Sequence, residues 1–169
     1  MEYKTRSERC LGIDPGLANC GWAVVGRNAS GKYRLLDHGC IKTTVDSTES
    51  ERALSIYQKI SEVIGVHMPN TVAIERVFFN KNVSSAITTG GVVFLCLLAA
   101  EQAGIESLQV KPQSAKAAIG FATADKSKVR QMVSKLTGVS VKNVHAADAA
   151  AVAIAGLLRG KRIDGEIAG

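Results

Sequence analysis

The sequence predicts an α/β domain in which helices cover a mixed β-sheet, and two observations support this fold class. Three strand-like segments joined by short turns come first, and segments of helical spacing then alternate with two further strand-like segments. Short turns join antiparallel strands, whereas two strands separated by a helix form a parallel crossover. We therefore expect a mixed five-stranded sheet, a three-stranded antiparallel meander plus parallel strands, flanked by helices.

The meander is predicted from apolar runs that end in turn residues. Residues 11–14 (LGID) form a short apolar run that stops at a Pro-Gly pair, which breaks a strand. Further strands are expected at 21–25 and 33–43, and the residues at 28–31 between them favour a turn. The three strands are therefore expected to pair in sequence order.

The period of the apolar residues changes after the third strand. Thr48 and Glu51 have the spacing of a capping box, and apolar residues recur at helical spacing from there to a Pro-Asn pair at 69–70. Strand-like and helical segments alternate after this helix. The expected elements are strands at 71–75 and 108–110 and helices at 83–103, 114–119, 125–136 and 144–158.

The composition describes one globular domain with a basic surface. A chain of 169 residues, 46% of them hydrophobic, is long enough to bury a core without disulfides or metals. Its 21 Lys and Arg residues exceed its 15 Asp and Glu residues by six, which is the formal net charge of +6. A basic surface suits a polyanion such as nucleic acid, although charge alone leaves that partner open.

Cysteine usage predicts a cytoplasmic protein. The four cysteines show no C-x-x-C spacing and lie among apolar residues, so we expect free thiols in a reducing compartment and no structural zinc site. Residues 1–8 are polar and lack the apolar stretch of a secretory signal. The apolar run at 92–100 is shorter than the ~20 residues that span a bilayer. We interpret it as part of a buried helix and expect no membrane association.

Two carboxylates are predicted at the carboxyl ends of strands. Side chains two residues apart in a strand share a face, so Asp14 lies on the side of Gly12 and Glu75 on the side of Ala73. Another element can approach the sheet closely over such small residues. Because open α/β sheets bind ligands outside the carboxyl ends of their strands, both positions are candidates for a functional site.

A histidine and an aspartate lie near the start of the last predicted helix. His145 and Asp148 are three residues apart, which places both on one helix face with Cβ atoms about 5–6 Å apart. Asn143 is a suitable N-cap for this helix. The later turns are almost entirely apolar, so we expect the helix to pack against the core, where two ionisable groups require an explanation.

Each of these residues also has an ordinary interpretation. Asp14 suits a turn, Glu75 can pair with Arg76, and Asp148 favours a helix N-terminus. Three carboxylates at one sheet edge, however, would repel by about 4 kcal/mol per pair at ~4 Å and an effective dielectric of about 20, so a cluster requires a cation or protonation. Oxygen-rich ligation with one imidazole suits Mg²⁺ or Mn²⁺ better than zinc. The spacing leaves open whether the side chains converge.

Four separate motifs resemble those of RuvC-type Holliday junction resolvases. They are residues 11–17 (LGIDPGL) with 20–25 (CGWAVV), 73–79 (AIERVFF) with 81–82 (KN), 124–129 (ADKSKV) and 145–149 (HAADA). The resemblance implies an RNase H-like fold for residues 10–159, after a short N-terminal extension at 1–9 and before a tail at 160–169 that we expect to be disordered. It also implies a cytoplasmic homodimer that resolves four-way DNA junctions in recombination and repair by paired symmetric nicks that leave 5′-phosphate ends, in contact with a RuvA/RuvB branch-migration complex.

The resemblance assigns roles to individual residues. Asp14, Glu75 and Asp148 match the acidic metal ligands of the family, and His145 stands where members carry Asp or His. These four would hold two Mg²⁺ ions, with Mn²⁺ as a possible substitute, about 3.5–4 Å apart as in two-metal hydrolysis. Lys126 matches a basic residue near the reacting phosphate, which adds it to the catalytic set, and Phe78 matches an aromatic that stacks on a junction base. The expected DNA contacts are Phe78, Arg76, Lys81, Lys116, Lys126 and Lys128.

The sequence departs from the family pattern at positions that bear on dimer packing and DNA contacts rather than on metal ligands. Residues 90–94 (GGVVF), within the altered stretch 88–94, replace a polar Gly-Gln-Ala-x-Gly segment, so the geometry of the dimer is left open. The loop after Gly120 lacks a second glycine, and the stretch before Cys10 is longer than usual.

Three other functions compete with resolution of junctions. Actin-like ATPases open with a similar G-I-D-x-G turn, but they need two such domains and this chain has room for one. An RNase H-like nuclease of the YqgF type, acting on structured RNA, would share the first strand but fit the 124–129 and 145–149 motifs less well. A junction-binding module without cleavage would not need the complete set of candidate ligands.

Overall fold

A computed structural model describes residues 8–78 and 83–163 and confirms the mixed five-stranded sheet. The strands lie in the order β3-β2-β1-β4-β5. The first three pair antiparallel, and β4 and β5 run parallel to β1. The strands are β1 (Glu8–Asp14), β2 (Asn19–Arg27), β3 (Tyr33–Lys42), β4 (Thr71–Glu75) and β5 (Glu106–Val110).

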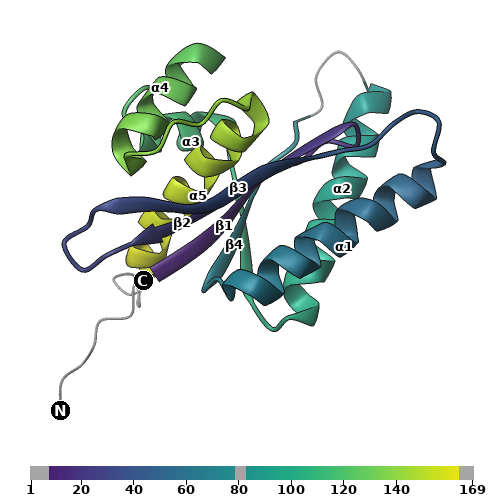
Figure 1. The fold of residues 1–169 in the computed structure, drawn as a ribbon, viewed down its shortest axis with the longest axis horizontal. Coiled ribbons are helices and arrows are strands. Elements are labelled where there is room, and N and C mark those ends of the chain that lie inside the picture. Colours follow the sequence, from purple (N-terminus) through teal and green to yellow (C-terminus); the bar gives the residue numbers. More distant parts are fainter. Residues whose placement is uncertain (1–7, 79–82, 164–169) are drawn as a thin grey trace, which may run out of the picture.

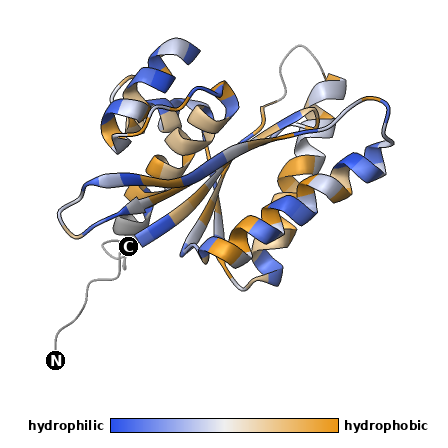
Figure 2. Cartoon of the chain, in the orientation of Figure 1, coloured by the Kyte–Doolittle hydropathy of each residue, from blue (hydrophilic) through white to orange (hydrophobic). Residues whose placement is uncertain are grey.

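Helices cover the two faces of this sheet in two separate groups (Figure 1). One face carries α1 and α2, and the other carries α3, α4 and α5. In Figure 2 hydrophobic residues of the helices lie mainly toward the sheet, while the outer side of α1 is hydrophilic. The helices are α1 (Glu49–His67), α2 (Val83–Gln102), α3 (Pro112–Ala118), α4 (Lys126–Thr137) and α5 (Val144–Ile163).

The alternation of side chains along β1 and β4 assigns each face of the sheet to one helix group. Leu11 and Ile13 of β1 and their counterparts in β4 pack with α1 and α2. The opposite face presents Gly12 and Ala73, and α5 lies directly on it. A Cβ at Gly12 would stand 2.0 Å from the carbonyl oxygen of Ala149. Only glycine permits this contact, which brings the backbone of α5 onto β1.

Local signals in the sequence define the start of α1 but not the end of α5. Thr48 and Glu51 form the expected capping box at the start of α1. Helix α5 continues to Ile163 instead of ending at 158, so residues 160–163 of the predicted disordered tail belong to a helix. The last residues, 164–169, lie outside the described residues, as do 1–7. Strand β1 begins at Glu8, within the predicted N-terminal extension.

Helix α2 is only half buried, which corrects the interpretation of residues 92–100 as a buried segment. Val92, Val93 and Cys96 pack against the sheet, whereas Phe94 is 73% exposed and Leu98 is 49% exposed. The sheet and α1 cover one side of the helix, and within the described residues no element covers the other. By length and composition α2 is the one described helix that could cross a membrane, although its inner side packs on α1, β4 and β5.

Candidate active site

A cleft of about 690 Å³ lies at the carboxyl ends of β1 and β4, beside the start of α5. All four of the predicted metal-ligating residues line it: Asp14 from β1, Glu75 from β4, and His145 and Asp148 from α5. Helices α1 and α2 form the opposite wall. The structure thus brings together residues that are up to 134 positions apart, from Asp14 to Asp148.

The start of α5 is held over the sheet by a glycine and an N-cap. A Cβ at Gly21 of β2 would lie 2.2 Å from the carbonyl oxygen of His145, so glycine is required for α5 to begin where it does. The Asn143 side chain accepts a hydrogen bond of 3.0 Å from the backbone of Ala146, which confirms it as the N-cap. From this position Nδ1 of His145 reaches Oδ2 of Asp14 at 2.9 Å.

Burial raises the pKa of all three carboxyl groups of the cleft, and neighbouring carboxylates add to the rise at Glu75 and Asp148. Burial, and then the charges of Asp14 and Asp148, raise the pKa of Glu75 to about 7. Burial and the charge of Asp14 raise the pKa of Asp148 to about 6. The pKa of Asp14 is also raised by burial, against the hydrogen bond and charge of His145. Lysine charges oppose the rise, but they do not neutralise the cluster.

A cluster of this kind suits a divalent cation. Within the described residues no three His, Cys, Asp or Glu side chains are arranged so that they could hold a metal ion as they stand. Their chemistry nevertheless fits one, because three partly buried carboxylates that favour protonation in the absence of a cation are the oxygen donors that Mg²⁺ prefers. The bond between His145 and Asp14 keeps one of those donors occupied.

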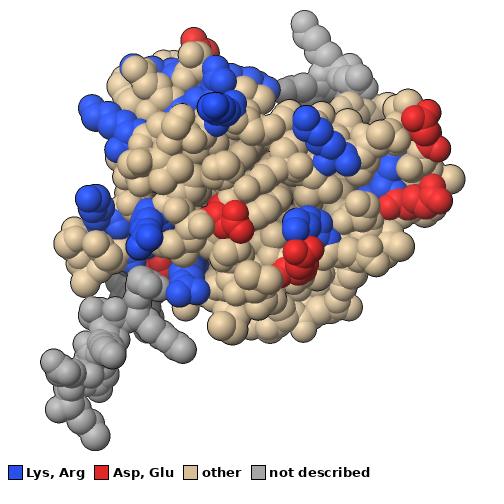
Figure 3. Space-filling model, in the orientation of Figure 1, with Lys and Arg blue, Asp and Glu red and all other residues tan. Residues whose placement is uncertain are grey.

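Two of the predicted DNA-contacting lysines line the cleft. Lys116 of α3 and Lys126 of α4 stand on its wall, and the charge of each lowers the pKa of both Glu75 and Asp148. In Figure 3, Lys and Arg side chains gather over the side of the molecule that holds α4 and the β2–β3 hairpin. A phosphate that enters the cleft would therefore meet cations on the side opposite α1 and α2.

The other predicted contacts lie beside the cleft rather than in its lining. Phe78 is 45% exposed, and the guanidinium carbon of Arg76 lies 5.8 Å from its ring centroid. Between the described residues Glu75 and Arg76 there is no ion pair, so the ordinary interpretation of Glu75 is wrong. Lys128 lies over the ring of Phe121 at 4.8 Å. Lys81 lies outside the described residues.

Arg52 is a cationic residue of the cleft that was not predicted from the sequence. Arg52 of α1 lines the wall opposite the lysines, and its Nε donates a hydrogen bond of 2.8 Å to Oγ1 of Thr43. That hydroxyl donates in turn to the carbonyl oxygen of Leu17, in the loop after Asp14. No motif marks Arg52, because only the packing of α1 on the sheet brings it to the cleft.

Comparison with known proteins identifies the family. The family model of crossover junction endodeoxyribonuclease RuvC matches residues 10–156. This chain belongs to the RuvC family. A RuvC of Chloroflexus aggregans is 41% identical over 149 residues, which is 86% of this chain and 90% of that protein. A RuvC of Rubrobacter xylanophilus is 40% identical over 147 residues, 85% of this chain and 82% of that protein.

Solved structures agree with this assignment. The RuvC of Thermus thermophilus in complex with a Holliday junction substrate superposes with a TM-score of 0.83 at 29% identity, and the match covers 91% of this chain and 96% of that one. The yeast mitochondrial resolvase Ydc2 superposes with a TM-score of 0.67 at 17% identity, which shows a shared fold alone. Membership of the RuvC family makes this chain an endodeoxyribonuclease with an RNase H-like fold, as the motifs predicted.

Proposed function

We propose that this RuvC protein resolves four-way DNA junctions by paired hydrolytic nicks in recombination and repair, and that Asp14, Glu75, His145 and Asp148 form its active site. The observation that carries the proposal is the cleft itself, where three carboxylates and an imidazole face lysines at the carboxyl end of the sheet. The Thermus relative, which is similar over nearly its whole length, was solved with a Holliday junction substrate.

The residues of the cleft have different roles in the proposed reaction. Lys116 and Lys126 attract the backbone phosphate and hold it against the carboxylate side. Asp14, Glu75, Asp148 and His145 would hold Mg²⁺, with two ions as the number proposed. When bound, the metal supplies a water of lowered pKa and stabilises charge on the reacting phosphate. His145 orients the Asp14 carboxylate through their hydrogen bond.

The position of Phe78 and Arg76 suits a role in holding the junction open. Both lie just past the end of β4, beside the cleft, with the ring of Phe78 partly exposed and supported by the guanidinium of Arg76. An exposed ring can stack on an unpaired base, a contact worth roughly 1–3 kcal/mol. We propose this role for Phe78, and phosphate contacts for Arg76, Lys81 and Lys128.

The assembly that paired nicks require is proposed to be a homodimer through α2. Val83, Ile87, Phe94 and Leu98 are all exposed and follow one another at helical spacing, which forms an apolar stripe along the outer side of α2. Gly91 lies in the same stripe, and a Cβ there would meet nothing within 4 Å. A twofold interface pairs the same patch on both subunits, so one such stripe can close a dimer.

Contact with a RuvA/RuvB complex and a cytoplasmic location are also proposed. The family resemblance supports the first. The four cysteines are free, as a reducing compartment requires, and this supports the second.

A synthetic mobile four-way junction tests the proposed function. We expect nicks at symmetric positions on two opposing strands, dependent on Mg²⁺ or Mn²⁺ and absent on linear duplex of the same sequence. Asp14→Asn should slow nicking by about 10²–10³-fold while junction binding stays, because one electrostatic group is lost and the basic contacts remain. Asp46→Asn, in an exposed turn, is the matched control. Cleavage of structured RNA in preference to the junction would contradict the proposal.

The oligomeric state is tested separately by sedimentation. Phe94→Glu should convert a dimer to a monomer and uncouple the two nicks, because a charge would face the same charge across the twofold axis. Val45→Glu, at a position that is 87% exposed outside α2, should leave the dimer unchanged. A Phe94→Glu protein that sediments as the wild type does would exclude α2 as the interface.

A further inference from the structure

We propose that the chain carries a second phosphate-binding site, distant from the active cleft, which holds the backbone of one DNA arm. This site, the hairpin pocket, is defined by Arg9 at the start of β1 and by Arg27, Lys32 and Arg34 around the β2–β3 turn. The proposal goes beyond the catalytic site and rests on the proposed function only in taking DNA as the ligand.

The hairpin pocket is a cavity of about 570 Å³ between the β2–β3 hairpin, β1 and the residues that follow α4. Arg9 pairs in register with Gly26, and Gly26 pairs with Arg34. Residues opposite one another in neighbouring strands point to the same face of a sheet. The middle residue has no side chain, and the side chain of Leu36 packs over it, 3.4 Å from where a Cβ of Gly26 would stand. Arg9 and Arg34 therefore lie on one face of the sheet, next to an apolar part of the lining.

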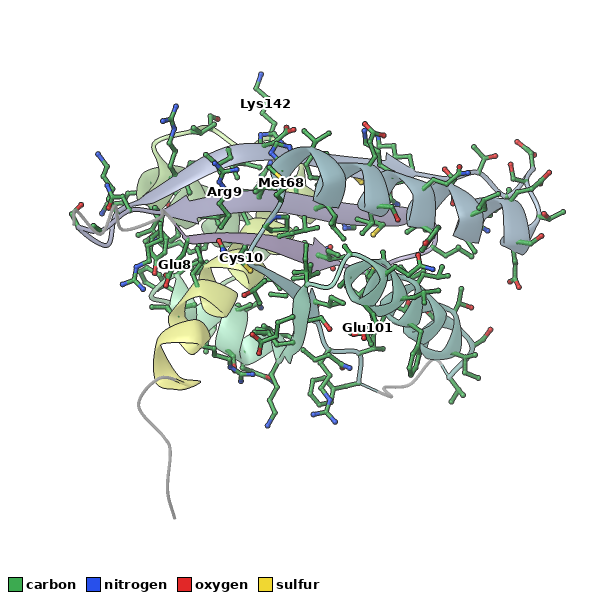
Figure 4. The ribbon with its side chains drawn as sticks, turned by 90° about the horizontal axis from the view of Figure 1, so that it is seen from below. Glu8, Arg9, Cys10, Met68, Glu101 and Lys142 are labelled. Carbon is green, nitrogen blue, oxygen red and sulfur yellow. The ribbon has the colours of Figure 1, made fainter. Side chains whose placement is uncertain are left out.

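The charges of the hairpin pocket are of one sign. Its lining contains four cationic side chains and no Asp or Glu. Arg9 is held by a hydrogen bond of 3.0 Å from Nη1 to the carbonyl oxygen of His67, at the end of α1. Figure 4 shows Arg9 on the side of Met68, with Glu8 and Cys10 on the other side of β1. Because the lining has no carboxylate, a bound anion would offset the repulsion among these four cations.

Arg27 pairs with Tyr33, so it points to the other face of the hairpin from Arg34, and it provides a separate observation that points to an anion at the hairpin edge. Its guanidinium carbon lies 5.7 Å from the ring centroid of Tyr33, which fixes the side chain. Nε and Nη1 of Arg27 are nevertheless buried and have no hydrogen-bond partner. Buried donors without an acceptor destabilise a fold, whereas the fork of a guanidinium matches two oxygens of a phosphate.

The size and spread of the hairpin pocket favour a phosphodiester backbone over a single phosphate ion. A cavity of about 570 Å³ is much larger than one phosphate, and its cations come from three strands and the β2–β3 turn. Lys32 and Arg34 are exposed, so they can follow a backbone that passes over the hairpin. A row of such cations is how proteins follow a nucleic-acid strand without reading its sequence.

The hairpin pocket and the active cleft lie at opposite ends of β1. The five residue steps from Arg9 to Asp14 cover about 17 Å at ~3.4 Å per residue. That length corresponds to about five base pairs at ~3.4 Å per step along one strand. An arm that leaves the cleft must therefore extend beyond this length before it can reach the hairpin pocket.

Arm length consequently provides the test. The double variant Lys32→Ala/Arg34→Ala changes two exposed side chains and is compared with the wild type on junctions with long arms and with arms of about five base pairs. On long arms we expect about tenfold weaker binding and a slope of log K against log salt that is shallower by about 1.8, because two phosphate contacts are lost. On short arms we expect no change, and the nicking rate at saturating protein should be that of the wild type.

The matched control is Lys59→Ala/Lys142→Ala, which removes the same charge outside both pockets. Lys59 pairs with Glu62, and Lys142 extends away from the ribbon in Figure 4. An equal loss of binding in the control, an equal loss on both arm lengths, or no loss in the hairpin variant would overturn the proposal. A wild-type protein that binds and nicks normally in that experiment would leave the proposed function intact, whereas a wild type that does neither would refute the function itself.

Competition by inorganic phosphate distinguishes a free phosphate ion from the DNA backbone as the ligand of the hairpin pocket. Millimolar phosphate that abolishes the difference between wild type and hairpin variant at constant ionic strength would show a site for the free ion and overturn the assignment to DNA. Persistence of that difference supports it.

Discussion

Nδ1 of His145 lies 2.9 Å from Oδ2 of Asp14 and joins the first turn of α5 to the last residue of β1. Both side chains are largely buried, at 29% and 18% relative exposure, in the wall of the cleft. The contact orients a carboxylate that is otherwise raised in pKa by burial. His145 is therefore a positioning residue as the structure stands, besides its proposed place among the metal ligands.

Replacement of His145 tests that role. His145→Ala should lower the nicking rate by about 10–100-fold, the scale on which loss of a residue that orients a metal ligand acts, with little effect on junction binding. His145→Asp should keep much of the activity, since a carboxylate can ligate the same cation. If both variants bind the junction and nick it at the wild-type rate, neither ligation nor positioning by His145 contributes.

The raised carboxyl pKa values predict how stability depends on pH in the absence of metal. Glu75 has an ordinary pKa of 4.5 and one of about 7 in the folded chain, so the folded state holds more protons between these values. The free energy of unfolding therefore falls as pH rises through that range. Asp148 acts in the same direction between 3.8 and about 6.

Thermal unfolding with and without Mg²⁺ measures this effect. The metal-free protein should lose several degrees of Tm between about pH 5 and pH 8, at ~2–4 °C per kcal/mol for a chain of this size. Glu75→Gln should remove part of that loss, and Mg²⁺ should raise Tm more at the higher pH because protons compete with the metal there least. A Glu75→Gln protein whose Tm falls with pH as steeply as that of the wild type would contradict the assignment.

Lys126 is expected to influence both the rate and its pH profile. Its charge lowers the pKa of Glu75 and of Asp148. Lys126→Ala should slow nicking by about 10²-fold and move the acidic limb of the rate profile to higher pH. Lys128→Ala, two residues along but outside the cleft lining, is the control and should leave the profile in place. If Lys126→Ala nicks more slowly but its pH–rate profile does not shift, Lys126 contacts the phosphate without influencing the carboxyl groups.

Glycine substitutions test whether close packing of α5 builds the site. Gly21→Ala would place a methyl group 2.2 Å from the carbonyl oxygen of His145, so we expect a loss of ~1–3 kcal/mol of stability and slower nicking together. Gly65→Ala in α1 meets nothing within 4 Å and should gain roughly 0.5–1 kcal/mol without a change in rate. Denaturant unfolding and the junction assay measure the two effects. A stable and fully active Gly21→Ala protein would show that α5 can shift without cost.

Local patterns in the sequence were sufficient for much of the site. Strand parity placed Asp14 and Glu75 on the side of small residues, and helical spacing placed His145 and Asp148 on one face of α5. These predictions succeeded because parity and helical period depend on neighbours within a few residues. Boundaries were less accurate, as at the end of α5, since packing on the sheet stabilises turns that propensity alone does not.

Only the tertiary structure decided which segments that are distant in the sequence lie together. Arg52 reaches the cleft, α2 keeps an exposed apolar side, and Arg27 is left with unpaired donors, none of which any motif indicated. By itself the sequence determined the family, the order of helices and strands along the chain, and the chemical groups at the strand ends. The fold decided which of these groups meet, because the approach of α5 to β1 and β2 depends on three-dimensional packing over glycine rather than on any local signal.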